Sequence, residues 1–497
     1  MNRRDFFKMS GVGGLAALNL GVIAQTLAQS PPSSFTPATV AGRDPVTHII
    51  NRLTLGVTPE LYQYVSRIGV EAFIEEQLNP ESIDDTDCDS RLEMFPLIYQ
   101  PATDLLDDEN GRRTATYQLM GATVVRAVYS RRQLYERMVN FWSDHFHIYI
   151  RNGNITSILK LDDDRAAIRT NALTTFRQIL GASAHSPAML FYLDNFQSRA
   201  EHPNENYARE LMELHTLGVN GGYTEDDVQA VARAFTGWSM GNRRDGEGQG
   251  EFVFRQRVHD DGEKVILGES LPAGRGIEDG EAVLDILASH PSAARFISTK
   301  LVRRFVADFP PESLVTRCAD TFLQTGGDIK AVLRVIFTSE EFWNAPPRFK
   351  RPLEYTYSLM RGLAYQTGFG REMWQGLAAG LEAMGQVPFS WPAPNGYPDV
   401  GAYWMSNLLP RWNMAINLVE GGAAGSPNYA AINALIEANG VTTDDTLASL
   451  NFLGRYLYGR DLTEVETQII AEFMTAFPGD LLAGASLLIA APAFQYF

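Results

Sequence analysis

Apolar residues recur at helical spacing through most of the chain. From Thr47 onward they return every three or four positions, the period of amphipathic helices. Within residues 59–78, for example, Leu61, Val65 and Ile68 fall on roughly one face. The pattern predicts helices over residues 59–78, 117–146, 163–183, 204–217, 224–236 and 280–306. The sequence therefore predicts a predominantly α fold, with a large multi-helix globular body.

One segment departs from this period and favours β structure. Residues 251–255 (Glu-Phe-Val-Phe-Arg) and 264–267 (Lys-Val-Ile-Leu) flank the acidic turn His259-Asp260-Asp261-Gly262. Two short apolar runs around a polar, glycine-containing turn are typical of a hairpin. We expect one small β-hairpin near residues 250–271.

Polar and proline-rich stretches divide the chain into four regions. Residues 30–34 (Ser-Pro-Pro-Ser-Ser) have the composition of a linker, and residues 421–426 form a glycine-rich joint between helical patterns. These boundaries predict a signal peptide over 1–28, a flexible linker over 29–42, a main helical domain over 43–420, and a C-terminal helical segment over 421–497 packed on that domain.

The first 28 residues resemble a twin-arginine export signal. Arg3-Arg4-Asp5-Phe6-Phe7-Lys8 precedes a weakly apolar stretch, and Thr26-Leu27-Ala28 suits cleavage after small residues. The alternatives are a general secretory signal or a short amphipathic start. The twin-arginine route carries proteins that are already folded, so we expect a protein exported in its folded state to the periplasm or outside the cell.

Charge and cysteine content exclude several classes of protein. The formal net charge is −17, and removal of residues 1–28 makes it more negative, so nucleic acid is not expected as a partner. No apolar run after residue 28 is long enough to span a membrane. Cys88 and Cys318 fit no zinc, iron–sulfur or covalent haem spacing. Because the chain is expected to fold before export, two free thiols are favoured over a disulfide.

The densest group of charged residues lies on the predicted helix 204–217. Glu205, Arg209, Glu210 and Glu213 fall in one sector of that helix, while His215 projects from the other side. Carboxylates around an arginine can hold a cation, a sugar hydroxyl or each other. An exposed ladder of ion pairs four residues apart is the alternative, and it needs no ligand.

Three further places add candidate groups. Asp194 precedes this helix, His145 and His147 lie in the run Phe141–Ile148, and His259 stands at the expected hairpin turn. His145 is either a buried or capping residue or a ligand or general base, whereas a structural role is favoured for His147. The aromatic loop of residues 391–398 suits stacking on a sugar ring or holding a partner, and core packing explains it equally well.

Three motifs are missing from the sequence. It contains no Gly-x-x-x-x-Gly-Lys loop, no His-Glu-x-x-His and no strand-bounded Gly-x-Gly-x-x-Gly. A nucleotide triphosphatase and a nicotinamide dehydrogenase are thereby disfavoured.

Several segments together resemble a secreted bacterial family, domain of unknown function 1800. The segments are residues 53–59, 141–146, 204–218, 234–238, His259-Asp260 with Lys264 and Gly268, and Lys300-Leu301. The resemblance spans nearly the whole mature chain. It implies export, brings no established activity, and suggests as partner a co-exported protein resembling alkaline phosphatases and sulfatases.

The functional hypotheses differ in the use of these residues. In the first, an exported, metal-assisted hydrolase has an Asp/Glu/His pocket with a divalent metal. Its catalytic residues are Glu210, His215, His145 and Arg209, and its metal residues are Asp194, Glu205, Glu213 and His259. In the second, a non-catalytic protein binds the sulfatase-like partner or an envelope polysaccharide. A third, weaker hypothesis is that the chain carries a cofactor.

Overall fold

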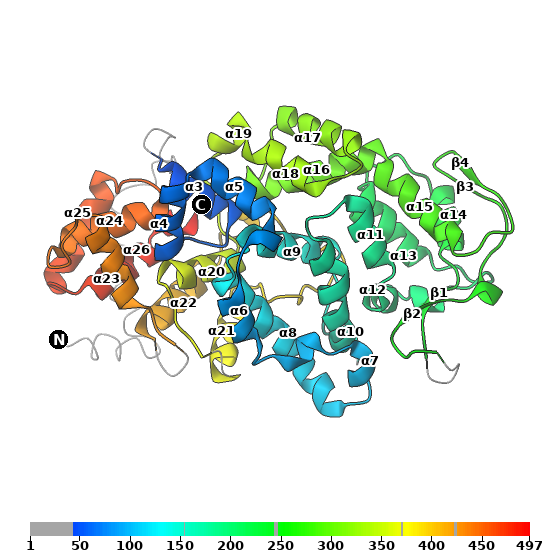
Figure 1. Ribbon diagram of the computed structural model, residues 1–497, viewed down its shortest axis with the longest axis horizontal. Helices are drawn as coiled ribbons and strands as arrows, with labels where there is room; N and C mark the ends of the chain where they lie inside the picture. Colours follow the sequence, from blue (N-terminus) through cyan, green and yellow to red (C-terminus); the bar gives the residue numbers. More distant parts are fainter. Residues whose placement is uncertain (1–42, 154, 243–246, 369–370, 422–424) are drawn as a thin grey trace. The chain divides into compact units, whose positions relative to one another are not determined.

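A computed structural model describes residues 43–153, 155–242, 247–368, 371–421 and 425–497. The regions predicted as signal peptide (1–28) and linker (29–42) lie outside these residues. Residues Arg43–Phe497 form one compact unit. The structure confirms the predominantly α class: helices make up most of the described chain, and the strands are short (Figure 1).

The first part of the unit is built from helices joined by short turns. Its elements are α3 (Pro45–Leu53), α4 (Pro59–Ile68), α5 (Val70–Leu78), η1 (Pro80–Ser82), α6 (Thr86–Leu92), η2 (Pro96–Tyr99), α7 (Ala102–Leu105), α8 (Glu109–Tyr129) and α9 (Gln133–His145). Predicted helix 59–78 is divided at Gly69, whose φ of 87° ends α4. Among its neighbours, α9 contacts α3, α5, α8 and η3 (Figure 1).

The middle part contains two π-helical segments. Its helices are α10 (Thr156–Asp162), η3 (Asp163–Arg169), α11 (Phe176–Ala184), α12 (Pro187–Tyr192), η4 (Asn195–Gln197), α13 (Glu205–Glu210), η5 (Leu211–Thr216) and α14 (Glu225–Ala234). In η3 and η5 the chain follows the wider π-helical turn, which is rare and is frequent at functional sites. Asn204 caps α13 by accepting hydrogen bonds from the backbone of Asn206 and Tyr207.

Within the described ranges, the β structure consists of two small antiparallel sheets. The strands are β1 (Trp238–Met240), β2 (Phe252–Phe254), β3 (Lys264–Ile266) and β4 (Glu269–Leu271), with η7 (Gln256–Val258) between the sheets. Both expected strands exist, but they do not pair with each other: β2 pairs with β1, and β3 pairs with β4. The reason is local, because Leu267 and Gly268 adopt positive φ values of 51° and 85° and turn the chain directly after β3.

The last part returns to helices. They are α15 (Glu278–Ser289), α16 (Pro291–Phe305), α17 (Glu312–Gln324), α18 (Ile329–Phe337), α19 (Glu340–Trp343), α20 (Pro352–Gly362), α21 (Arg371–Ala383), η8 (Gly401–Trp404), α22 (Leu408–Glu420), α23 (Tyr429–Ala438), α24 (Thr446–Tyr458), α25 (Glu464–Ala476), α26 (Leu481–Ala490) and η9 (Pro492–Gln495). The C-terminal helices contact earlier elements: α26 packs on α22, α24 on α3 and α23 on α4.

A continuous apolar core runs from Ile49 to Phe494 and joins these parts. A smaller aromatic cluster, formed by Phe349, Tyr397 and Trp404, lies beside it. Cys88 and Cys318 are buried free thiols, and burial raises the pKa of both. None of the described helices is long and apolar enough to cross a membrane.

Candidate functional site

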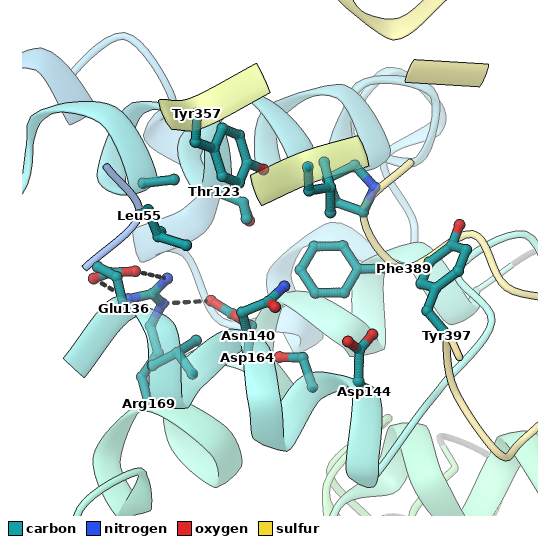
Figure 2. A pocket seen from close by; sticks show the side chains of 15 residues that line it. Leu55, Thr123, Glu136, Asn140, Asp144, Asp164, Arg169, Tyr357, Phe389 and Tyr397 are labelled. Carbon is teal, nitrogen blue, oxygen red and sulfur yellow. Dashed lines mark hydrogen bonds and ion pairs between the residues drawn. The ribbon is translucent and has the colours of Figure 1, made fainter. Parts of the chain in front are cut away.

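Helix α9 presents a polar face to a pocket. Glu136, Asn140 and Asp144 are four residues apart and therefore lie on one side of the helix. That side faces a small pocket, which α8, η3, α20 and the loop after α21 complete (Figure 2). The lining residues are Leu55, Thr123, Ala127, Glu136, Val139, Asn140, Ser143, Asp144, Asp164, Arg169, Leu353, Tyr357, Pro388, Phe389 and Tyr397.

An ion-pair group forms one wall of this pocket. Arg169 donates two hydrogen bonds to the carboxylate of Glu136, at 2.9 and 3.0 Å. Its Nε donates a third, at 2.8 Å, to Asp164 Oδ2 (Figure 2). Burial alone would raise the pKa of Asp164, but Arg169 and Arg126 outweigh it and hold the pKa below its ordinary value. Asp164 is therefore ionised, and both carboxylates already have the Arg169 guanidinium as a partner.

A second group of charges lies at the other end of the polar face. Arg351 donates from Nη1 to Asp144 Oδ2 and from Nη2 to Asn140 Oδ1, both at 2.9 Å. Arg304 donates to the same Asn140 oxygen at 3.2 Å and lies 3.6 Å from Asp144 Oδ2. The two guanidinium groups thus fix both side chains and compensate the charge of Asp144.

Further buried charges support these two arginines. Asp399 accepts from Arg304 at 2.8 Å and also pairs with Arg348. Glu354 lies 3.5 Å from Arg351 and 3.4 Å from Arg137. Burial acts to raise the pKa of Glu354, yet Arg351 and Arg137 lower it to about 2. Glu354 therefore remains ionised within this buried charge network.

The loop after α21 is held against the end of α9. Phe389 O accepts from Ile150 N at 2.9 Å, and Trp391 O accepts from His147 Nε2 at 2.7 Å. Gly396 has a φ of 69°, and a Cβ there would lie 2.0 Å from the carbonyl oxygen of Asp144. Only glycine fits such a close approach in this conformation. The contacts place the rings of Phe389 and Tyr397 on the pocket wall (Figure 2).

Three buried polar atoms on the lining have no hydrogen-bond partner within the part of the chain that the structure describes. They are Ser143 Oγ, Asp164 Oδ1 and Tyr357 Oη. Their residues are only 4, 3 and 2% exposed, respectively. Buried polar groups are nearly always hydrogen-bonded, because an unsatisfied one costs about 1–3 kcal/mol. These atoms come from α9, η3 and α20, three of the elements that line the pocket.

Two of the residues predicted to be catalytic, His145 and His215, meet outside this lining. His145 Nε2 donates to the carbonyl oxygen of His215 at 2.9 Å, and Lys300 Nζ donates to His145 Nδ1 at 2.8 Å. Burial, followed by the charge of Lys300, lowers the pKa of both histidines, to about 3 for His215. Both imidazoles are therefore neutral, and His145 has the tautomer protonated at Nε2.

The charged residues predicted on helix 204–217 lie at the surface. Arg209 pairs with Glu225 at 2.9 Å and lies 3.7 Å from Glu205. Glu210 is half-buried, and burial together with the neighbouring Glu213 raises its pKa. The group is an exposed ladder of ion pairs, the alternative considered from the sequence.

The two remaining predicted residues have separate surroundings. Asp194 is exposed and adopts a left-handed φ of 60°. His259 is buried, donates from Nδ1 to Thr236 O at 2.8 Å, and has Nε2 3.4 Å from Asp279 Oδ2. Within the described ranges, no group of three or more His, Cys, Asp or Glu side chains is arranged to hold a metal ion. The eight predicted site residues are thus distributed over several environments, and we do not place the site among them.

The sequence analysis did not select the residues that line the pocket. Glu136, Asn140 and Asp144 carried a signal, since they recur every four residues along the helix and so mark one polar face. The sequence also contains a Gly-x-Ser-x-Gly run at residues 237–241, the spacing found around some catalytic serines. Its Ser239 lies on β1, donates to Phe196 O and accepts from Arg255, both at 2.8 Å. It therefore does not form a strand-to-helix elbow.

Comparison with protein families identifies the chain. The model of a family described as "Protein of unknown function (DUF1800)" matches residues 48–496. The chain therefore belongs to this family, as the sequence motifs suggested. No curated protein and no solved structure gave a match.

Proposed function

We propose that this member of the DUF1800 family binds a small, neutral, hydroxyl-rich ligand, such as one sugar unit, in the pocket beside α9. The observation that carries the proposal is the set of three unpartnered atoms on the lining, Ser143 Oγ, Asp164 Oδ1 and Tyr357 Oη. An ionised carboxylate oxygen needs a donor, and a hydroxyl can donate or accept. Ligand hydroxyl groups supply both roles.

The charges of the lining favour a neutral ligand. Glu136 and Asp164 are paired with Arg169, and Asp144 is paired with Arg351 and Arg304. No lining carboxylate is left without a cation, so a charged ligand gains little from entering. An ion would also lose its hydration, which costs more than the loss of hydration at a hydroxyl.

The rings of the loop suit a sugar in particular. Phe389 and Tyr397 line the pocket on the side opposite the wall formed by Arg169 and its two carboxylates (Figure 2). A sugar ring presents apolar C–H faces as well as hydroxyl groups, and an aromatic wall with a few placed polar atoms matches that character.

The expected export of the protein is part of this proposal. An exported binding protein meets envelope polysaccharide, one of the partners that the sequence analysis considered. The docking of a sulfatase-like protein stays a prediction. Metal-assisted hydrolysis also stays a prediction, and the geometry of the described residues does not favour it.

Titration calorimetry with glucose, galactose and N-acetylglucosamine tests the proposal. We expect one of these sugars to bind with a Kd on the order of 1 mM or below, as expected for a ligand of this size. Tyr357→Phe removes one unpartnered hydroxyl without changing the shape of the pocket. It should weaken binding about fivefold, because one hydrogen bond contributes about 1 kcal/mol.

Tyr355→Phe, on the same helix, is the matched control. Tyr355 Oη donates to Arg411 O at 3.2 Å away from the pocket, so its loss should lower the free energy of unfolding by about 1 kcal/mol and leave sugar binding unchanged. Tyr357→Phe should leave the stability equal or higher. Absence of binding by all three sugars, or equal effects of the two variants on binding, would contradict the proposal.

A further inference from the structure

We propose that the side-chain amine of Lys300 binds carbon dioxide as a carbamate, so that this position of α16 carries a reversible anionic group. The inference concerns the pair of Lys300 and His145 outside the pocket, and it is independent of the ligand proposed there. It rests on the neutral hydrogen-bond partner of the amine, on its lack of a carboxylate partner among the described residues, and on an arginine one helical turn further along α16.

The hydrogen bond from Lys300 ends on a neutral acceptor. His145 Nε2 donates to the carbonyl oxygen of His215 at 2.9 Å, so the other ring nitrogen, Nδ1, carries a lone pair. This lone pair accepts from Lys300 Nζ at 2.8 Å. The amine nitrogen also lies 5.3 Å from the centroid of the Phe296 ring, which attracts a cation only weakly. Neither partner carries the negative charge that would compensate an ammonium group.

The other lysines that the structure describes differ in charge compensation or in access. Lys160, Lys264 and Lys330 each pair with a carboxylate. Lys300 and Lys350 have no carboxylate of the described residues within 4 Å of the amine nitrogen. Lys350 is only 1% exposed, whereas Lys300 is partly exposed. Lys300 therefore combines an uncompensated amine with access from solvent.

The surroundings of Lys300 favour the neutral amine, which is the form that reacts with carbon dioxide. Burial lowers the pKa of Lys300 to about 8, although the charges of Asp399 and Asp144 act in the opposite direction. About half of these amines are therefore uncharged at pH 8. A lysine in water has a pKa of about 10.4 and is almost fully protonated at this pH.

A carbamate matches both neighbours of the amine. It retains one N–H, which can donate to His145 Nδ1 as the amine does. Its two oxygens share one negative charge, and Arg303 lies three residues further along α16, hence on the same side of the helix. Arg303 donates from Nε to Asp308 O at 3.2 Å and has no carboxylate of the described residues within 4 Å. The carbamate supplies the anion that this guanidinium lacks.

The reaction needs no reactant besides carbon dioxide and water. The nitrogen lone pair forms a bond to the carbon of carbon dioxide, and one C–O π bond becomes a lone pair on a carboxylate oxygen. The nitrogen then releases one proton to water. No atom is oxidised or reduced, and the reverse step restores the free amine.

NMR of the full protein in carbon-13-labelled bicarbonate at pH 8 tests the inference. We expect a carbamate signal that Lys300→Met removes, because this variant keeps an unbranched side chain and lacks the nitrogen. Arg303→Gln keeps the amine and should lower the ratio of carbamate to free amine about fivefold, the size expected for a partly exposed ion pair. Lys330→Met is the matched control and should leave the signal unchanged, because that amine is already paired with Glu81.

Three outcomes would overturn the inference. One is the absence of any carbamate signal, and another is that every carbamate signal persists in the Lys300→Met variant. The third is a signal that Lys350→Met removes and Lys300→Met leaves, because the carbamate then lies on the other uncompensated lysine. Circular dichroism verifies that each variant is folded. If Lys300→Met does not fold, Arg303→Gln decides, and an unchanged ratio of carbamate to amine in that variant contradicts the proposal.

Discussion

Two helices of this protein carry three polar residues at the same spacing and use them differently. On α9, Glu136, Asn140 and Asp144 face a pocket and bind buried arginines. On α13 and η5, Glu205, Arg209 and Glu213 are partly or fully exposed, and Arg209 pairs with Glu205 and Glu225.

The difference between the two faces lies in their surroundings, because the spacing is the same. The α9 face lies under α8, α20 and a loop more than 240 residues away in sequence, which remove it from water. In low dielectric each charge must be compensated, so the arginines become indispensable. On α13 water solvates the charges, so the ion pairs contribute little to the free energy of unfolding.

The largest expected effect comes from removing an arginine beneath the α9 face. Arg351→Met leaves Asp144 and Glu354 without a main partner, and we expect a loss of about 3–5 kcal/mol in the free energy of unfolding, measured with urea. Arg351→Lys, which keeps the charge, should lose less. Arg209→Met is the counterpart on α13 and should change the stability little. Similar losses in the Arg351→Met and Arg209→Met variants would remove the distinction between the two faces.

Acid should also destabilise the buried charge network, because it protonates Glu354. The pKa of Glu354 is about 2 in the folded protein, below its ordinary value, because of Arg351 and Arg137. A carboxyl whose pKa is lowered on folding stabilises the protein above its unfolded pKa, and this stability disappears as the pH falls through the folded pKa. We expect a loss of about 3 kcal/mol between pH 5 and pH 2 in urea unfolding.

The exposed ladder provides the control for this acid dependence. Glu225→Gln removes an exposed carboxyl and should leave the loss at low pH unchanged, since its charge interacts mainly with solvent and Arg209. A stability that stays constant down to pH 3 would show that Glu354 is not held ionised as described.

The smallest expected effect concerns the α13 face itself. Burial and Glu213 raise the pKa of Glu210, so Glu213→Gln should lower the Glu210 pKa, as measured by NMR titration of its carboxyl carbon. Glu464→Gln, on the distant α25, should leave it unchanged. An unchanged Glu210 pKa in the Glu213→Gln variant would show that the two carboxylates do not face each other.

Much of the fold could be predicted from the sequence, because the signals that specify a helix, its apolar period and its cap residues, lie within the helix itself or next to it. The period of apolar residues gave the class, and Asn204 and Thr224 marked the true starts of their helices. The predicted helices were too long where the pattern continued through a break, as at Pro291, which begins α16. Strand pairing was wrong because β1, the partner of β2, lies outside the segment that was considered.

The candidate site could not be predicted in the same way. Asp164, Tyr357 and Phe389 come together only through the tertiary fold, and no local pattern links them. Helix 204–217 was predicted to carry the site because its charged residues are dense, but exposed ion pairs produce the same pattern in a sequence. Polar residues that recur on one face of a helix, as at Asn140 and Asp144, are the more useful signal, since each needs a hydrogen-bond partner once it is removed from water.

The π-helical turn of η3 determines the direction in which its last side chains point toward the pocket. An α-helix advances about 100° per residue, and a π turn holds roughly one residue more than an α turn. The side chains after the turn are therefore rotated relative to those of an uninterrupted helix. Arg169 stands at the end of this turn, where it reaches Glu136 and Asp164 together. A chain shorter by one residue here would keep every side chain of the wall and lose the alignment between them.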